Sequence, residues 1–200
     1  MRRFSAILAT AAAVLAVAAP VATADVTNAG GVSNVVMASS SSANPTDTQS
    51  RLQTAFVGGD VVAPVNLAQA QASDCTGCRS VAVAVQAVFV GGSPSVFTPT
   101  NAATAVNDNC TSCVSFAYAW QETVQTPGPV RLTRAGKRHI RTLRSEISDA
   151  ASSDLPPDQL QARLDELTTE LDTVIHNQIE KSGQPADTSV HEQVDAGPTG

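Results

Sequence analysis

The chain has 200 residues, enough for one or two domains, and a formal net charge of −6 at pH 7. This acidic balance argues against generic nucleic-acid binding. Aromatic residues make up only 4% of the chain, and Ala, Val, Ser and Thr are frequent, so we expect a thin, closely packed core.

The first 24 residues have the pattern of a secretory signal peptide. Arg2 and Arg3 precede an apolar run over residues 4–19, and residues 22–24 form a small-x-small cleavage site. An uncleaved anchor helix is the alternative, although the run is short for one. We therefore expect a bacterial protein that is secreted or cell-envelope associated and starts at Asp25. The loss of Arg2 and Arg3 would take its charge from −6 to −8.

One pattern occurs twice at an offset of 35 residues. Each copy reads Pro-x-Asn-x-Ala-x-Ala, then Cys-x-x-Cys, then Ser-x-Ala-x-Ala-x-Gln, starting at Pro64 and at Pro99. A poorer copy without cysteines occupies residues 25–63, where Asn34 and Gln53 match Asn66 and Gln86. Repeats of this length indicate one supersecondary unit that stacks on its neighbours.

Side-chain alternation predicts strands over 79–90 and 114–125. Val114, Phe116, Tyr118 and Trp120 alternate with small residues, which is a period of two. A buried helix over 79–90 remains the alternative, because Ala is a poor strand residue.

The segment before each cysteine pair mirrors the segment after it, about a turn centred on Thr76 or Thr111. We interpret each unit as an antiparallel β-hairpin with a three-residue loop, a left-handed residue at Gly77 or Ser112, one Ala-lined face and one bulky face.

Helical periodicity begins after residues 126–129. Apolar residues recur at helical spacing over about 134–151 and, with heptad-like spacing, over about 157–181. The predicted fold class is therefore α+β. It comprises β-hairpin repeats over 25–126, about three units with the first degenerate, an antiparallel helical hairpin or short coiled coil over 131–181, and a disordered tail over 182–200.

The cysteine pairs allow three interpretations. Disulfides Cys75–Cys78 and Cys110–Cys113 are favoured, because exported thiols oxidise and each pair flanks a tight loop. Pairing between repeats and a four-cysteine zinc site remain alternatives. A thioredoxin-like redox motif fits less well, because strands rather than a helix follow the cysteines. We expect no cofactor and no bound metal.

Half of the basic residues lie in one short run without an intervening acid. They are Arg131, Arg134, Lys137, Arg138, Arg141 and Arg144. The simpler interpretation is a solvated helix face that pairs with acids of the second helix (Asp158, Asp165, Glu166, Glu170, Asp172). The alternative is an anion-binding patch of Arg134, Lys137, Arg138, Arg141 and Arg144 for anionic envelope polymers or lipid headgroups.

The repeat, together with the Leu-Thr-x-Ala-Gly-Lys-Arg segment that starts at Leu132, resembles exported proteins of high-GC bacteria. It is also similar to the C-terminal extension of proteins named peptide zinc metalloproteases. The resemblance covers about residues 64–144. The peptidase part, with its His and Glu metal motif and its membrane helices, has no counterpart in this sequence, so the resemblance implies no protease activity.

The sequence thus predicts a non-enzymatic structural or interaction protein of the bacterial cell envelope. Its partner would be another copy or another envelope protein, reached through the helical hairpin, with weak contact to anionic polymers and none to nucleic acid. The alternative is a metal-binding or thiol-redox protein that uses the two Cys-x-x-Cys pairs.

Overall fold

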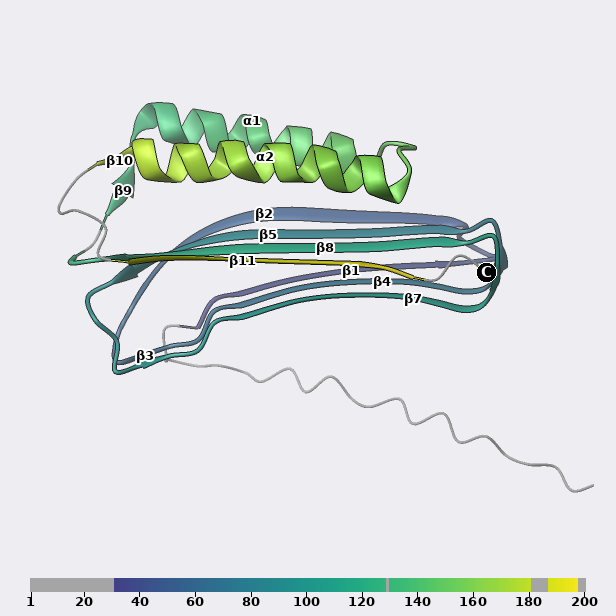
Figure 1. Cartoon of the computed structure of the whole chain (residues 1–200), viewed down its shortest axis with the longest axis horizontal. Helices are drawn as coiled ribbons and strands as arrows, with labels where there is room; N and C mark the ends of the chain where they lie inside the picture. The colour runs from purple at the N-terminus through teal and green to yellow at the C-terminus, as the bar shows by residue number, and fades with distance from the viewer. Residues whose placement is uncertain (1–30, 129, 181–186, 198–200) are drawn as a thin grey trace, which may run out of the picture.

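The structure, a computed structural model, describes residues 31–128, 130–180 and 187–197. The expected signal peptide lies outside these residues. Two sheets of mainly parallel strands face each other, and two helices cover the outer side of one of them (Figure 1).

The first sheet, called sheet A here, contains β1 (Ser33–Ser41), β4 (Val65–Thr76) and β7 (Thr100–Thr111), in that order. Sheet B contains β2 (Thr46–Gly58), β5 (Arg79–Gly91) and β8 (Val114–Thr126), with β11 (Asp187–Ala196) antiparallel at its edge. Two short strands, β3 (Val61–Val62) and β6 (Val96–Phe97), pair in the loops that return the chain from sheet B to sheet A.

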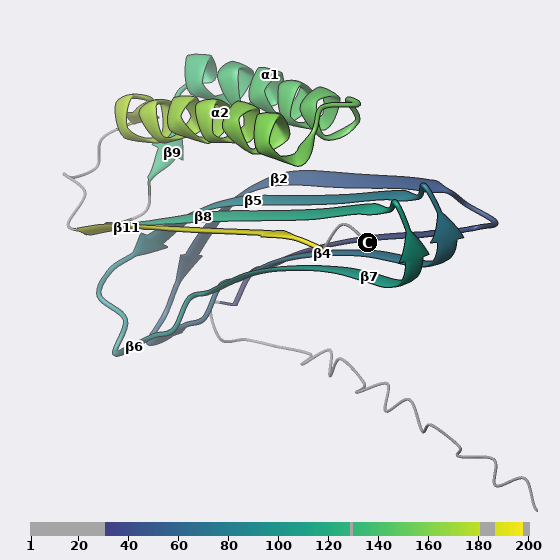
Figure 2. The same cartoon turned by 45° about the vertical axis from the view of Figure 1, so that its right-hand side comes forward.

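Each repeat is one coil of a β-solenoid. A coil consists of a sheet A strand, a tight arc and a sheet B strand, and the next coil lies beside it in parallel register (Figures 1 and 2). Equivalent residues are neighbours: Asn34 pairs with Asn66, and Asn66 pairs with Asn101. This register confirms that the cysteine-free segment is a first copy of the repeat.

The predicted β-hairpin repeats are wrong. The two arms of each unit fold back at the cysteines as expected, but they do not pair with each other. Their backbones pair with equivalent strands of the neighbouring coils, and the arms face each other across the interior. The arms face each other in this way because the small side chains of their Ala-lined sides let two sheets stack closely. A mirrored pattern is equally compatible with arms paired edge to edge and arms stacked face to face.

The interior between the sheets is narrow and built from small residues. Its central cluster contains Val36, Ala38, Ala68, Ala70, Ala82, Ala84, Ala103, Ala105, Ala117 and Ala119. The alternation predicted for residues 79–90 and 114–125 thus produces strands, and the alternative helix over 79–90 is excluded by β5.

The bulky side of sheet B faces the helices. α1 (Arg134–Ala151) and α2 (Pro157–Asn177) form one layer over it (Figure 2). Val83, Tyr118 and Trp120 pack there with Leu143 and Leu164 in the largest buried cluster. Burial of this apolar surface is the main stabilising term for the helical layer.

The helices begin where the sequence predicts. Thr133 is the N-cap of α1, and its Oγ1 accepts a hydrogen bond from Gly136 N at 2.9 Å. α2 ends at Asn177, four residues early, because β10 (Ile179–Glu180) pairs with β9 (Arg131–Leu132) and closes the base of the two helices. The apolar stripes pack on a sheet instead of forming a separate coiled coil. Among the described residues, neither helix has the length and apolar character that a membrane crossing requires.

The expectation of a disordered tail is wrong for β11. Its ten residues pair with β8 from Gln125 to Phe116. The segment is polar because it is an edge strand that faces solvent. Its apolar and polar residues alternate too weakly over Thr188–His191 to predict a strand from sequence. β11 closes the C-terminal end of the solenoid.

Candidate functional site

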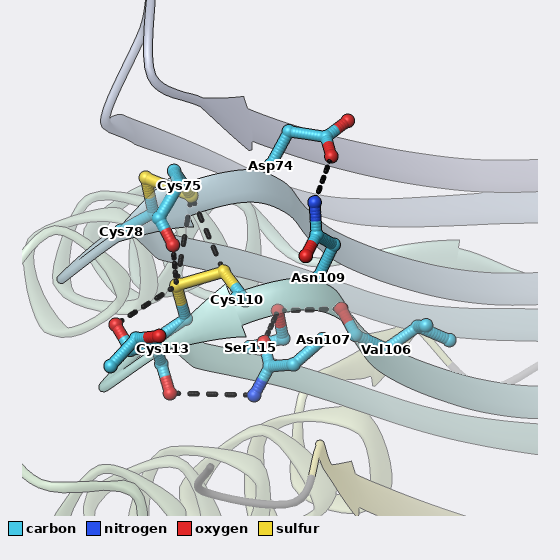
Figure 3. The surroundings of a disulfide bond; sticks show 10 residues. Asp74, Cys75, Cys78, Val106, Asn107, Asn109, Cys110, Cys113 and Ser115 are labelled. Atoms are coloured by element: carbon cyan, nitrogen blue, oxygen red, sulfur yellow. Dashed lines mark hydrogen bonds between the residues drawn. A yellow bond between two sulfur atoms is a disulfide. The ribbon is translucent and has the colours of Figure 1, made fainter.

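Two arcs carry the cysteines (Figure 3), and they need left-handed backbone at defined positions. Asp74 and Asn109 open the arcs with φ of 51° and 48°. Gly77 and Ser112 precede the second cysteine with φ of 68° and 54°, as predicted. Asp and Asn tolerate this conformation well, which explains their place at the start. Asn109 Nδ2 donates to Asp74 Oδ1 at 2.6 Å and links the two arcs.

Each arc is closed by a disulfide between its own cysteines. The Cα atoms of Cys75 and Cys78 lie 6.1 Å apart and those of Cys110 and Cys113 5.8 Å apart, so the predicted pairing is confirmed. Parallel register stacks the bridges, and Cys75 Sγ lies 3.3 Å from Cys110 Sγ and 3.6 Å from Cys113 Sγ. Each bridge links the end of a sheet A strand to the residue just before a sheet B strand.

Two amide ladders run through the interior. Asn34 Nδ2 donates to Asn66 Oδ1 at 2.8 Å, and Asn66 Nδ2 donates to Asn101 Oδ1 at 2.7 Å. On the other sheet, Gln121 Nε2 donates to Gln86 Oε1 at 2.7 Å, and Gln86 Nε2 donates to Gln53 Oε1 at 2.9 Å. Each of these bonds joins equivalent amides of neighbouring coils.

The basic residues form an exposed surface on α1. Arg134, Lys137, Arg138 and Arg141 point away from the buried side that Ile140 and Leu143 occupy. Arg144 lies at the border of this surface, and its Nε donates to Leu52 O of β2 at 3.3 Å. We call the five cations the α1 basic face: Arg134, Lys137, Arg138, Arg141 and Arg144.

The expected pairing of this face with acids of α2 does not occur among the described residues. Glu166 pairs with Arg163 instead, and Glu170 pairs with His139. No carboxylate within the described ranges lies within ion-pair distance of the α1 basic face. The sequence correctly predicted a solvated face of cations on α1, but the expected pairing with the acids of α2 is wrong for the described residues.

A second cluster joins α2 to β8. Glu122 lies at a bulky-face position of β8, fully buried, and His176 Nε2 lies 2.9 Å from its Oε1. His176 Nε2 is also 3.4 Å from Asp172 Oδ1. Burial, reinforced by the negative charge of Asp172, raises the pKa of Glu122 to about 8. Glu122 is therefore largely protonated at neutral pH.

Beside this cluster, a cavity of about 220 Å³ lies between α2, β8 and β11. Its lining residues are Trp120, Asp165, Thr168, Thr169, Asp172, Val190 and Glu192. The Tyr118 hydroxyl lies 3.1 Å from Asp165 Oδ1 and from Thr168 Oγ1, and burial keeps its pKa far above the usual range. Burial and the charge of Asp165 raise the pKa of Glu192 as well.

Sequence reasoning did not identify this cluster. One signal was present, because Glu122 continues the series Phe116, Tyr118, Trp120 at a position where an apolar residue is expected. Asp172 and His176 lie one helical turn apart on α2, but nothing in the sequence indicates that this turn covers Glu122.

Comparisons with protein-family models, curated proteins and solved structures find no match to this chain. The resemblance of residues 64–144 to the extension of the peptide zinc metalloproteases therefore stays a prediction.

Proposed function

We propose that the protein is an exported structural or interaction protein of the bacterial cell envelope, and that it contacts anionic envelope polymers through the α1 basic face. The observation that carries the proposal is the exposed run of cations on α1, which has no acidic partners among the described residues.

This arrangement is costly for the helix. Arg134 and Arg138, like Lys137 and Arg141, are like charges four residues apart. They lie in the first half of α1, where the helix dipole disfavours cations, and the first turn contains no acid. A surface that binds polyanions offsets this cost when the ligand is present.

The disulfide-clipped solenoid supports the export part of the proposal. Structural disulfides persist in oxidising compartments and are rare in the cytosol. The two stacked bridges and the amide ladders would hold the coils rigid beneath the helical layer. Since the apolar sides of both helices are buried on sheet B, contact with a second copy through the helices would have to use their polar sides.

Polymer binding is tested with synthetic poly(glycerol phosphate), with neutral dextran as a reference. We expect Arg138→Gln/Arg141→Gln to weaken binding at least about tenfold at low salt, and added salt to weaken it further. Arg51→Gln/Arg163→Gln, which removes the same charge outside α1, should bind nearly as the unchanged protein does. Equal binding by both double variants, or binding that persists at high salt, would contradict the proposal.

Export is tested by the intact mass of the full-length chain produced in a bacterium, measured before and after alkylation. We expect a mature chain that begins at Asp25 and takes up no alkyl group until it is reduced. Retention of residues 1–24, or alkylation without reductant, would count against export.

One observation favours a second candidate, metal binding or thiol redox chemistry at the arcs. The sulfur atoms of Cys75, Cys110 and Cys113 lie within 4.8 Å of one another, so reduction would gather thiols at one place. Thiol titration with zinc analysis decides between the two. Four free thiols with one bound zinc in the isolated protein would support this candidate, and two intact disulfides would exclude it.

A further inference from the structure

We propose that Glu122, Asp172 and His176 form a binding site for a divalent transition-metal ion, with Zn²⁺ as the best fit. The site is separate from the cysteine arcs and from the α1 basic face, and it does not depend on the function proposed above. It joins the last strand of the third coil to the second helix.

The donor set suits such an ion. One imidazole nitrogen and two carboxylates are ligands that zinc takes in proteins, with bonds of about 2.0–2.2 Å. Tetrahedral geometry at these bond lengths puts donors roughly 3.4 Å apart. His176 Nε2 lies 3.4 Å from Asp172 Oδ1 and 2.9 Å from Glu122 Oε1, and the three donor groups lie within 4.8 Å of one another. To hold the ion, the distance between His176 Nε2 and Glu122 Oε1 would have to lengthen only slightly.

An independent observation comes from the carboxyl group of Glu122. The side chain is 0% exposed, and neither of its oxygens makes a hydrogen bond of standard geometry with any of the described residues. His176 approaches Oε1 closely but without the alignment of a hydrogen bond. A buried carboxyl without hydrogen bonds is costly, and a coordinated cation would remove that cost.

Rigid elements hold the three ligands. Asp172 and His176 are one turn apart on α2, so they present donors from the same side of the helix. Glu122 is paired with Val190 of β11 and with Ala87 of β5, which are both uncharged and leave its side chain directed at α2. The ion would therefore connect sheet B to the helical layer.

The neighbouring cavity gives the ion access to solvent. Asp172 lines it together with Asp165 and Glu192, and none of its lining residues is Lys or Arg. The carboxylates would attract a cation, and water in the cavity would supply the fourth ligand that three-ligand zinc sites keep open. The chemistry of the site is thus that of an open zinc centre.

The experiment uses the full oxidised protein after treatment with a chelator, titrated with Zn²⁺ by calorimetry. We expect one site. His176→Gln and Asp172→Asn should each weaken it by more than the roughly 10–100-fold that loss of an outer hydrogen-bond partner costs. His139→Gln is the matched control, because His139 also contacts a carboxylate, Glu170, but has no third donor in the part of the chain that the structure describes. This variant should bind Zn²⁺ as the unchanged protein does.

Co²⁺ in the unchanged protein provides a readout that needs no variant. Binding at the proposed site gives d–d absorption without a thiolate charge-transfer band. A thiolate band would place the metal at the cysteines and overturn the proposal. Zn²⁺ affinity that is equal in the unchanged protein and in folded His176→Gln would overturn it as well.

Discussion

At the scale of single residues, buried amides and small side chains hold the solenoid together. Asn66 is fully buried, and its Nδ2 donates to Asn101 Oδ1, Ala84 O and Trp120 O within 3.1 Å. It thus connects two coils and both sheets. Ladders of identical amides recur where strands stack in register, since each amide donates to the next.

We expect Asn66→Ala to lower the free energy of unfolding by roughly 2–4 kcal/mol, because the change removes the buried hydrogen bonds that Asn66 makes with Asn34, Asn101, Ala84 O and Trp120 O. Chemical denaturation measures the loss. Thr104→Ala, an exposed change on β7, should stay within about 0.5 kcal/mol. If Asn66→Ala lost no more stability than Thr104→Ala, the ladder would contribute little.

At Gly136 we predict that a Gly→Ala change lowers stability, which is the opposite of its usual effect in a helix. Gly→Ala inside a helix ordinarily stabilises it by about 1 kcal/mol. Here a Cβ at position 136 would lie 2.7 Å from Gln178 Cβ, where the end of α2 closes on the start of α1. We therefore expect Gly136→Ala to destabilise the protein by about 1–3 kcal/mol. Ser145→Ala on the exposed side of α1 is the control, and a stabilised Gly136→Ala variant would disprove the close approach.

At the scale of elements, β11 closes the C-terminal end of the solenoid. Besides pairing with β8, it presents side chains to the edge of β7. Gln193 Oε1 accepts from Ala103 N at 3.1 Å, and Asp195 Oδ2 accepts from Ala105 N at 2.8 Å. At the other end, Asp47 Oδ2 accepts from Ser39 N of β1 at 2.7 Å. Polar side chains therefore occupy backbone donors at both open edges, as natural proteins do to prevent edge-to-edge association.

A chain that ends at residue 186 lacks β11 and exposes the edges of β7 and β8. Loss of ten paired residues should cost about 2–5 kcal/mol and lead to self-association. Denaturation and sedimentation velocity measure the two effects. A chain that ends at residue 197 keeps β11 and should behave as the full chain does. A truncated chain that stays monomeric and equally stable would refute the capping role.

At the scale of the whole molecule, local features were predictable and their partners were not. The arcs, the alternating strands and both helices follow from residue patterns, such as Gly77 before a cysteine or Thr133 before a helix. The strand pairing does not, because the Ala-lined arms suit an antiparallel hairpin and a stacked coil equally well. Glu122 was missed for a similar reason, since its environment depends on where α2 docks.

The 35-residue repeat nevertheless contained the decisive information. In parallel register each residue lies beside its own equivalent, so Gln69 pairs with Thr104, and Val83 pairs with Tyr118. Identical Asn and Gln residues in successive copies gain most from this arrangement, because only stacking places like beside like. A repeat with amides at matching positions is therefore better evidence for a solenoid than for independent hairpins.

Backbone NOEs test the solenoid most directly. Strands paired within a sheet lie about 4.8 Å apart and share backbone hydrogen bonds, whereas the two facing sheets of the solenoid do not pair with each other. The fold predicts backbone contacts between residues 35 apart, such as Gln69 with Thr104 and Val83 with Tyr118. Strong Hα–Hα contacts between Ala68 and Ala84, with none at a separation of 35, would instead show antiparallel hairpins and contradict the parallel β-solenoid.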